Sequence, residues 1–376
     1  MEISVCMIVR NEEAVLERCL KCAVQFADEL IVVDTGSSDR TKEIAEKYTD
    51  RVYDYVWDDD FAAARNFSYE KAACDYVMWL DADDDIERED IERIKFLKRD
   101  MPSDTDVVYF RYTGDAAEDN LFGDNEVMRD RLVRRSLRPV WVYPVHEAIP
   151  IQKEWKELYR PDIRIFHRKR RINEERRNIR IFERKLSEGF VPDSFSRSYY
   201  CRELSVDGSH ERAVEEFHRL LREGSRGDID YAMFYYIHSM KKLNRCGELR
   251  KRLEDYVETY GGQEAALCTL GDLCLRDREY ERAAAWYREA LALQADICDK
   301  NIHFPAYREF LPLLGIGKAY IRMGRPAEAA AALKKAERIH PSYVELKLLK
   351  LYLERMDKKH ERTDEEADGS GKGGRA

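Results

Sequence analysis

The pattern of apolar and polar residues divides the chain into two parts. From residue 3 to about residue 170, short apolar runs alternate with stretches in which apolar residues recur every three to four positions. The expected strands are 3–9, 30–34, 51–56, 76–80, 107–112, 131–133 and 163–166, and the expected helices are 11–26, 40–48 and 61–71. Strands separated by helices of this length indicate a mostly parallel sheet. The polar segment 113–128 is predicted to be a loop that covers a binding site.

From about residue 171 the strand pattern gives way to helical periodicity with many charged residues. Two stretches share one spacing of small and aromatic residues, which are Gly271, Cys274, Ala283, Tyr287 and Ala290 in the first and Gly317, Tyr320, Ala329, Leu333, Ala336 and Pro341 in the second. This is the spacing of tetratricopeptide units, helix pairs that need neighbours to bury their apolar faces. Weaker copies surround Ala213 and Leu249, and an insertion of about a dozen residues is expected around 301–310.

These patterns predict a mostly parallel, Rossmann-like α/β sheet followed by an all-α helical repeat domain. The expected boundaries are 1–170 for the α/β domain, 171–195 for a linker helix, 196–356 for the repeats and 357–376 for a disordered tail. The tail is charged and then rich in glycine, a composition that cannot form a packed core. A plain helical bundle is the alternative for the second half.

Composition and charge narrow the class of protein. The chain has 376 residues and a net charge of −9, which argues against general nucleic-acid binding. No apolar run is long enough to span a bilayer, and a strand that begins at residue 3 leaves no room for a secretory signal peptide. The nine scattered cysteines fit a reducing cytoplasm, so a cytoplasmic location is expected. Cys19 and Cys22 share one helical pattern and are interpreted as core and surface of that helix rather than a zinc site.

The most informative stretch is the acidic cluster that follows the apolar run 76–80. Asp81, Asp83, Asp84 and Asp85 lie where a buried strand is expected to leave the sheet. Ligands of open α/β sheets bind at the carboxyl ends of strands. Clustered carboxylates repel one another unless a cation intervenes, and Mg²⁺ or Mn²⁺ carrying a diphosphate suits them. The alternative is an acidic loop that caps the following helix through charges near its N-terminus.

Two further strand ends carry polar groups. Val9, Asn11 and Glu12 follow the first strand, where backbone and a carboxylate can contact a base or a ribose. The alternative is a helix N-terminus capped by Asn11. Asp34 ends the second strand before a Gly-Ser-Ser turn, and an acceptor-only carboxylate there suits the N3–H of uracil. The side chains of 38–39 are expected to cap the next helix.

The motifs and their order resemble those of a known family. The residues that carry the resemblance are 8–13 (Ile-Val-Arg-Asn-Glu-Glu), 31–39 (Ile-Val-Val-Asp-Thr-Gly-Ser-Ser-Asp), 64–66 (Ala-Arg-Asn), 80–84 (Leu-Asp-Ala-Asp-Asp), 131–134 (Arg-Leu-Val-Arg) and 145–147 (Val-His-Glu). Over about residues 1–170 the chain resembles a family 2 glycosyltransferase with the nucleotide-diphospho-sugar transferase fold. The family commonly has two acids at positions 34 and 35, and Thr35 departs from this pattern, which leaves the base open. With its repeats, the whole chain is similar to bacterial repeat-containing glycosyltransferases, including the peptide S-glycosyltransferases that modify bacteriocins.

The resemblance implies a role for each residue of the donor site. It implies that Asp81 contacts the ribose or the sugar, that Asp83 binds a divalent cation, and that Asp84 adds a contact to the sugar. It also implies that Arg65 and Asn66 hold the nucleotide sugar. For these two residues a solvated helix face is the alternative.

Transfer of a sugar to an acceptor requires a base within hydrogen-bond reach of the attacking group. Glu147 stands where the resemblance implies the catalytic acid residue, and His146 has the more suitable intrinsic pKa, so both are candidates with Glu147 preferred. The resemblance implies that His167 can complete the metal shell, although it also adjoins the basic run 168–171 and can simply be part of a linker. Arg131 is expected to face either the diphosphate or solvent.

The expected function is a metal-dependent, inverting transfer of a sugar from a nucleoside diphosphate sugar, preferably a UDP-sugar, to a side chain of a peptide or protein. The cofactor is expected to be Mn²⁺ or Mg²⁺. The repeats are expected to bind the peptide acceptor or to mediate self-association. One alternative is a cell-envelope glycan or lipid-linked sugar as acceptor, and another is a non-catalytic repeat scaffold.

Overall fold

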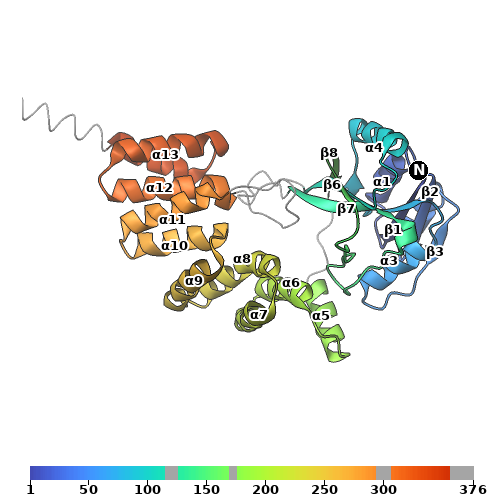
Figure 1. Cartoon of the computed structure of the whole chain (residues 1–376), viewed down its shortest axis with the longest axis horizontal. Coiled ribbons are helices and arrows are strands. Elements are labelled where there is room, and N and C mark those ends of the chain that lie inside the picture. Colours follow the sequence, from blue (N-terminus) through green and yellow to red (C-terminus); the bar gives the residue numbers. More distant parts are fainter. Residues whose placement is uncertain (115–125, 169–175, 294–305, 356–376) are drawn as a thin grey trace, which may run out of the picture. The chain divides into compact units, whose positions relative to one another are not determined.

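The computed structural model describes residues 1–114, 126–168, 176–293 and 306–355 (Figure 1). The described residues form two compact units, one up to residue 231 and the other from residue 232 onward. None of the described helices has the length and apolar character that a membrane crossing requires.

The first unit contains one sheet, built from the eight strands found among the described residues. These strands are β1 (Ile3–Val9), β2 (Glu29–Asp34), β3 (Val52–Asp54), β4 (Tyr76–Trp79), β5 (Asp84–Asp85), β6 (Val107–Gly114), β7 (Glu126–Arg134) and β8 (Glu157–His167). Their order is β3-β2-β1-β4-β7-β6-β8-β5. The pairs β3–β2, β2–β1, β1–β4 and β6–β8 are parallel, whereas β7 is antiparallel to both neighbours and β5 to β8. The predicted mostly parallel α/β sheet is confirmed.

The sheet carries a core on each face, as the two-residue period of its strands requires. In β4, Tyr76 and Met78 join the core that includes residues of α1 (Leu16–Ala23), α2 (Thr41–Ala45) and α4 (Arg88–Asp100). Val77 and Trp79 join the opposite core, which includes residues of α3 (Phe61–Glu70). The central strand is therefore buried on both sides, which explains its uninterrupted apolar run.

The parallel register brings several strand ends to one edge of the sheet. Val9 pairs with Asp34 across β1 and β2, and Cys6 pairs with Trp79 across β1 and β4. The acidic cluster after β4 therefore lies at the same edge as Asp34 and the end of β1. This is the edge at which open α/β sheets bind ligands.

Two local predictions in this unit are wrong. The first helix begins at Leu16 rather than at residue 11, because Asn11 has a φ of 54° and its side chain accepts a hydrogen bond from the backbone N–H of Ser38 instead of capping a helix. Asp84 and Asp85 do not cap α4, since they pair with β8 as the short strand β5. The predicted loop 113–128 is shortened at both ends by β6 and β7, and its remaining residues lie outside the described part of the chain.

Helices follow the sheet in the first unit. These are α5 (Arg177–Ser187), α6 (Ser194–Val206) and α7 (His210–Glu223), after a short 3-10 turn (Arg135–Leu137) within the sheet domain. Arg184 of α5 forms an ion pair with Asp59 at 2.6 Å, and Tyr143 donates a 2.5 Å hydrogen bond to Asp193 at the start of α6. These contacts tie α5 and α6 to the segments that precede α3 and follow β7. Helix α8 (Arg226–Lys242) contains the boundary between the units.

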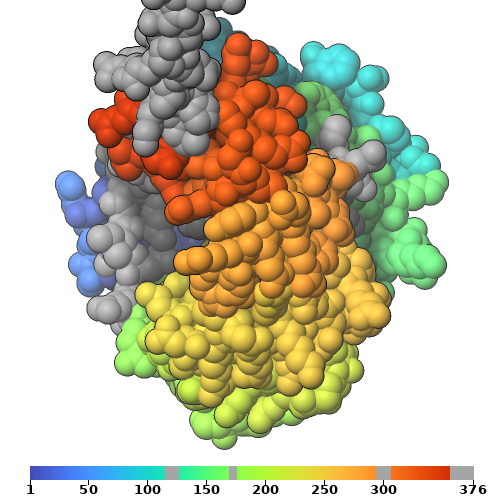
Figure 2. All heavy atoms as spheres, turned by 90° about the vertical axis from the view of Figure 1, so that its left-hand side faces the viewer, coloured from blue at the N-terminus to red at the C-terminus, as the bar shows by residue number. Residues whose placement is uncertain are grey.

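The second unit is helical. It contains α9 (Cys246–Tyr260), α10 (Glu264–Arg276), α11 (Tyr280–Ala292), a π-helical turn (Ala306–Phe310), α12 (Leu311–Arg322), α13 (Pro326–Ile339) and a helix over residues 344–355. Figure 2 shows these helices stacked in chain order, from yellow for α9 to red at the C-terminal end. Gly271 of α10 and Gly315 of α12 approach the ring of Tyr287 so closely that a Cβ at either position would overlap it. Position 271 therefore requires glycine because Tyr287 of α11 packs against it.

Candidate metal and nucleotide site

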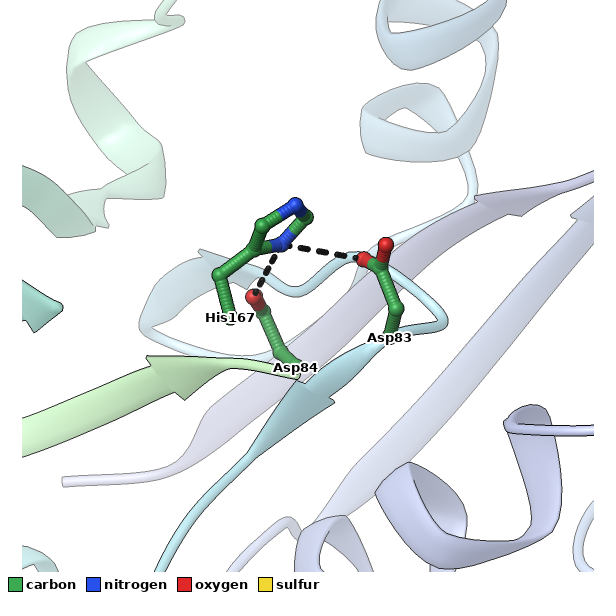
Figure 3. Close-up of side chains that lie close together, drawn as sticks. All are labelled: Asp83, Asp84 and His167. Atoms are coloured by element: carbon green, nitrogen blue, oxygen red, sulfur yellow. Dashed lines mark ion pairs between the residues drawn. The ribbon is translucent and has the colours of Figure 1, made fainter. Parts of the chain in front are cut away.

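Three potential metal ligands converge at the ligand-binding edge of the sheet (Figure 3). Asp83, Asp84 and His167 each offer one ligand atom, and these atoms all lie within 4.8 Å of one another. Nδ1 of His167 is 3.2 Å from Oδ1 of Asp83 and 3.8 Å from Oδ1 of Asp84. The antiparallel pairing of β5 with β8 produces this cluster, since it places Asp84 directly opposite His167.

The donor atoms fit a divalent cation. Oδ1 of Asp84 and Nδ1 of His167 are buried and lack a hydrogen-bond partner of good geometry among the described residues. A buried polar atom without a partner is unfavourable by about 1–3 kcal/mol, more when it is charged. Carboxylate oxygens with one imidazole nitrogen suit Mn²⁺ and are compatible with Mg²⁺. A cation bound between them would satisfy both orphaned atoms.

The electrostatics of this cluster favour positive charge at its centre. Burial lowers the pKa of His167, but the two carboxylates that face the ring outweigh burial and raise the pKa to about 10. A proton and a divalent cation would therefore compete for the same place. The backbone around the ligands is held by Arg18 of α1, which donates to the carbonyl oxygens of Asp83 and Arg168 at 3.2 Å each.

Arg131 supports the cluster from inside the protein. Its side chain and that of Asp84 are fully buried, and its Nη1 donates to Oδ2 of Asp84 at 2.8 Å. The guanidinium lies 3.6 Å from the ring centre of Trp79 and 4.5 Å from that of Tyr112. This burial contradicts the expectation that Arg131 faces the diphosphate or solvent. It also contradicts a direct sugar contact for Asp84, whose carboxylate is committed to Arg131 and to the cluster of potential metal ligands.

A second cluster joins Asp81 to Glu147 through Arg65. Arg65 of α3 donates from Nη2 to Oδ1 of Asp81 at 2.8 Å and from Nε to Oε1 of Glu147 at 2.7 Å. Its guanidinium packs against both Trp79 and Trp141, at 5.0 and 4.9 Å from the ring centres, and its side chain is only 7% exposed. Arg65 is therefore held rigidly rather than lying on a solvated helix face.

The charges in this second cluster stabilise one another. Burial alone would raise the pKa of Asp81, but the Arg65 guanidinium and, further away, Arg131 lower it below its usual value. Burial disfavours the charged form of Arg65, yet the two carboxylates raise its pKa above its usual value. Asp81 is therefore ionised and oriented before any ligand arrives.

Two predicted site residues have structural partners instead. The amide of Asn66 donates to the carbonyl oxygen of Trp141 at 2.9 Å and accepts from the N–H of Trp141 at 2.8 Å. Asn66 therefore positions Trp141 and has little left to offer a nucleotide. His146 has a φ of 55°, and its ring points to α6, where Nε2 lies 2.8 Å from Oε1 of Glu203. Tyr199 stacks on the same ring at 4.3 Å.

The orientation of His146 bears on the choice of base. Burial lowers the pKa of His146 despite its hydrogen bond to Glu203. Its neighbour Glu147 points instead to Arg65, so the two candidate bases face different partners. Glu203 and Tyr199 are residues that sequence reasoning missed, because nothing in the pattern of α6 indicates contact with a residue as many as 57 positions earlier.

The ends of β1 and β2 form the third part of the site. Val9 accepts hydrogen bonds at its carbonyl from the N–H and the hydroxyl of Thr35, at 3.0 and 3.1 Å. Asp34 is buried, and the N–H of Ser37 lies 3.0 and 3.1 Å from its two carboxylate oxygens. The N–H of Glu12 donates to the hydroxyl of Thr41 at 2.7 Å. These contacts fix the strand ends next to the acidic cluster.

Comparison with known proteins identifies the class of the first unit. Residues 4–155 match the sequence model of glycosyl transferase family 2, and residues 264–297 and 313–343 match that of the tetratricopeptide repeat. The first match includes every residue of the three clusters except His167, and the second coincides with the two predicted repeat units, which are confirmed.

Two similar proteins are named after the repeats and after glycosyltransferases, respectively. The chain is 27% identical over 264 residues to a TPR repeat-containing protein of Synechococcus elongatus, covering 68% of this chain and 65% of that protein. It is 36% identical over 100 residues to an uncharacterized glycosyltransferase of Haemophilus influenzae, covering 24% of this chain and 40% of that protein. The chain thus spans less than two thirds of each of these relatives.

Among solved structures, the chain aligns with glucosyl-3-phosphoglycerate synthase from Mycobacterium tuberculosis, which was solved in complex with Mn²⁺, UDP and glucosyl-3-phosphoglycerate. The alignment covers 52% of this chain and 82% of the synthase chain, at 18% sequence identity and a TM-score of 0.37.

Proposed function

We propose that this protein is a metal-dependent glycosyltransferase that uses a nucleoside diphosphate sugar as donor. The observation that carries the proposal is the convergence of Asp83, Asp84 and His167 at the ligand-binding edge of a family 2 glycosyltransferase domain. Asp34 ends β2 and Asp81 follows β4, the two strands that flank β1, so both lie at the same edge. Together these carboxylates fit a bound cation on one side and the hydrogen-bond donors of a nucleotide on the other.

Each cluster has its own task in this proposal. Asp83, Asp84 and His167 hold a divalent cation, which when bound neutralises the charge that develops on the leaving nucleoside diphosphate. Asp81, fixed by Arg65, orients the ribose or the sugar. Asp34 accepts a hydrogen bond from the base, for which the N3–H of uracil is the proposed partner.

Glu147 is the proposed base. Arg65 engages Oε1 of Glu147, and among the described residues no other donor reaches this carboxylate, so Oε2 can accept the proton of the acceptor. The acceptor then attacks the anomeric carbon from the face opposite the nucleotide, with inversion. His146 is less suited to this role because its Nε2 is bound to Glu203.

A peptide or protein side chain is the proposed acceptor because helical repeats commonly bind extended partners. Mass spectrometry of reactions that contain a panel of UDP-sugars with cysteine- and serine-containing peptides would test this. A mass increase of one hexose on a peptide supports it, whereas transfer only to glycan or lipid-linked sugar would replace the peptide by an envelope acceptor.

Replacement of Glu147 by Gln is expected to lower turnover with little effect on donor binding. The amide oxygen of Gln can still accept from Arg65, but it cannot take up a proton. We expect kcat to fall about 100- to 10,000-fold, the usual contribution of a general base. UDP release from the best UDP-sugar of the panel measures kcat, and calorimetry with UDP and Mn²⁺ measures binding.

Glu70→Gln is the matched control for this prediction, because Glu70 is an exposed glutamate on the same helix as Arg65. It should leave both quantities unchanged. Near-normal kcat in the Glu147→Gln variant would contradict the assignment of Glu147 as base while leaving the metal site in place.

A further inference from the structure

The last described helix, residues 344–355, has two apolar faces. Leu346 and Leu353 lie on its inner face and are 1% and 5% exposed. Val344, Leu348, Leu351 and Tyr352 are 69%, 60%, 50% and 52% exposed. Their spacing places these four residues along one side of a helix, about opposite to Leu346 and Leu353. We call these four residues the outer stripe.

The outer stripe differs from the polar outer face of a capping repeat, so it is suited to contact with another apolar surface. The residues that follow in the sequence cannot supply a covering helix face. Among residues 356–376, only Met356, Ala367 and Ala376 are apolar, and most of the others are charged or glycine. Residues 356–376 therefore lack the apolar residues that would cover the outer stripe.

A pocket adjoins the outer stripe. Leu348 and Tyr352 line this pocket of about 540 Å³ together with the apolar Leu275, Ile321 and Leu349 and the charged Arg276, Lys318, Arg322 and Glu345. The exposed side of the last helix therefore continues into the surface between neighbouring repeats. Isolated exposed apolar residues are normal, but a contiguous patch of this kind marks an interaction site.

We propose that the outer stripe binds the same stripe of a second copy of this chain, so that two last helices pack antiparallel about a twofold axis. The charged residues beside the outer stripe favour a second copy of this chain as the partner. Lys347 and Glu354 are both exposed and are seven residues apart, so they lie on the same flank of the helix. In an antiparallel pair related by a twofold axis, this flank faces the same flank of the partner.

The register of such a pair follows from these positions. With the axis near residue 350, Leu348 packs on Tyr352 of the partner subunit and Lys347 lies beside Glu354 of the partner subunit. The twofold axis repeats both contacts, which gives two ion pairs around an apolar centre. The helix is thus complementary to itself in charge as well as in apolar surface. The proposed pair would continue the helix stacking of the repeats into the second copy.

Sedimentation velocity of the full chain over a concentration series tests the proposal. The chain has a mass of 44.4 kDa, and we expect twice this mass for the unaltered protein. Leu348→Glu places a charge in the centre of the contact and should raise the dimer dissociation constant at least about 100-fold. Val206→Glu is the matched control, because Val206 is a 71% exposed valine on α6 and should leave the dimer intact.

Charge reversal tests the register itself. Lys347→Glu and Glu354→Lys should each weaken the dimer, since each places like charges opposite one another, and the double variant should restore it. Circular dichroism confirms that the exposed substitutions leave the fold unchanged. A single-chain mass at all concentrations would overturn the proposal. So would a dimer that Leu348→Glu leaves intact, or a double variant that is no tighter than the single ones.

Discussion

Replacement of Asp83 by Asn is expected to abolish metal-dependent turnover while the fold remains intact. Asp83 contributes one of the three converging ligand atoms and lies 3.2 Å from His167. The amide of Asn is a much weaker ligand for Mn²⁺ than a carboxylate. Because the bound cation is proposed to stabilise the leaving diphosphate by several kcal/mol, UDP release from a UDP-sugar should fall about 1,000-fold.

The neighbouring Asp85 offers a matched control. Asp85 follows Asp83 by two residues and lies in β5 beside Asp84, but it forms ion pairs with Arg18 and Arg168 and is not part of the group of potential metal ligands. Asp85→Asn should therefore retain turnover within about threefold of the unaltered protein. An equal loss of turnover in both variants would indicate that the total negative charge of this loop matters, and not the specific ligand Asp83. Normal turnover in Asp83→Asn would refute the metal assignment.

Replacement of Arg131 by Met is expected to cause the largest loss of stability in the first unit. The variant leaves the carboxylate of Asp84 buried without its counter-charge, and removal of one partner of a buried ion pair typically lowers the free energy of unfolding by about 3–5 kcal/mol. Urea unfolding followed by circular dichroism measures this change. The double variant Arg131→Met with Asp84→Asn should lose less, because no buried charge is then left uncompensated.

Lys42→Met is the control for the Arg131 prediction. Lys42 pairs with Asp54 at 2.7 Å, a length close to the 2.8 Å between Arg131 and Asp84, but its side chain is 40% exposed and that of Asp54 is 76% exposed. Solvent screens such a pair, so its loss should lower the free energy of unfolding far less than the loss of Arg131 does. If Arg131→Met were no more destabilising than Lys42→Met, the buried pair would not support the metal site as described.

The sequence predicted the sheet and the edge that carries the site because those features depend on local patterns. The short apolar run before Asp81 is typical of a buried strand, and parallel connectivity then places the carboxyl ends of such strands at one edge. Asp34, Asp81 and Asp83 were accordingly assigned to one edge without any knowledge of side-chain contacts.

The burial of Arg131 could not be predicted from local sequence patterns. The pairing of β6 with β7 passes from Val108–Leu132 to Tyr109–Asp130, so that Arg131 is the extra residue of a β-bulge. Bulges redirect a side chain, and they have no reliable signal in a single sequence. The alternation of apolar and polar residues along β7 therefore did not predict that this arginine is fully buried beside Asp84.

Contacts between distant segments were also beyond the sequence. Arg65 is 16 residues from Asp81 and 82 residues from Glu147, and it joins them only because α3 packs against the sheet beside Trp79 and Trp141. His146 reaches Glu203 because α6 packs against the segment after β7. Such pairs depend on tertiary packing, and intrinsic pKa values, which favoured His146 as a base, do not reveal them.

Anomalous diffraction from crystals grown with Mn²⁺ and UDP would test the metal site most directly. We predict one strong manganese peak at bonding distance from Asp83, Asp84 and His167, with the diphosphate of UDP on its open side and the uracil towards Asp34. A peak elsewhere, or UDP bound at this edge with no manganese between these three side chains, would contradict the proposed donor site.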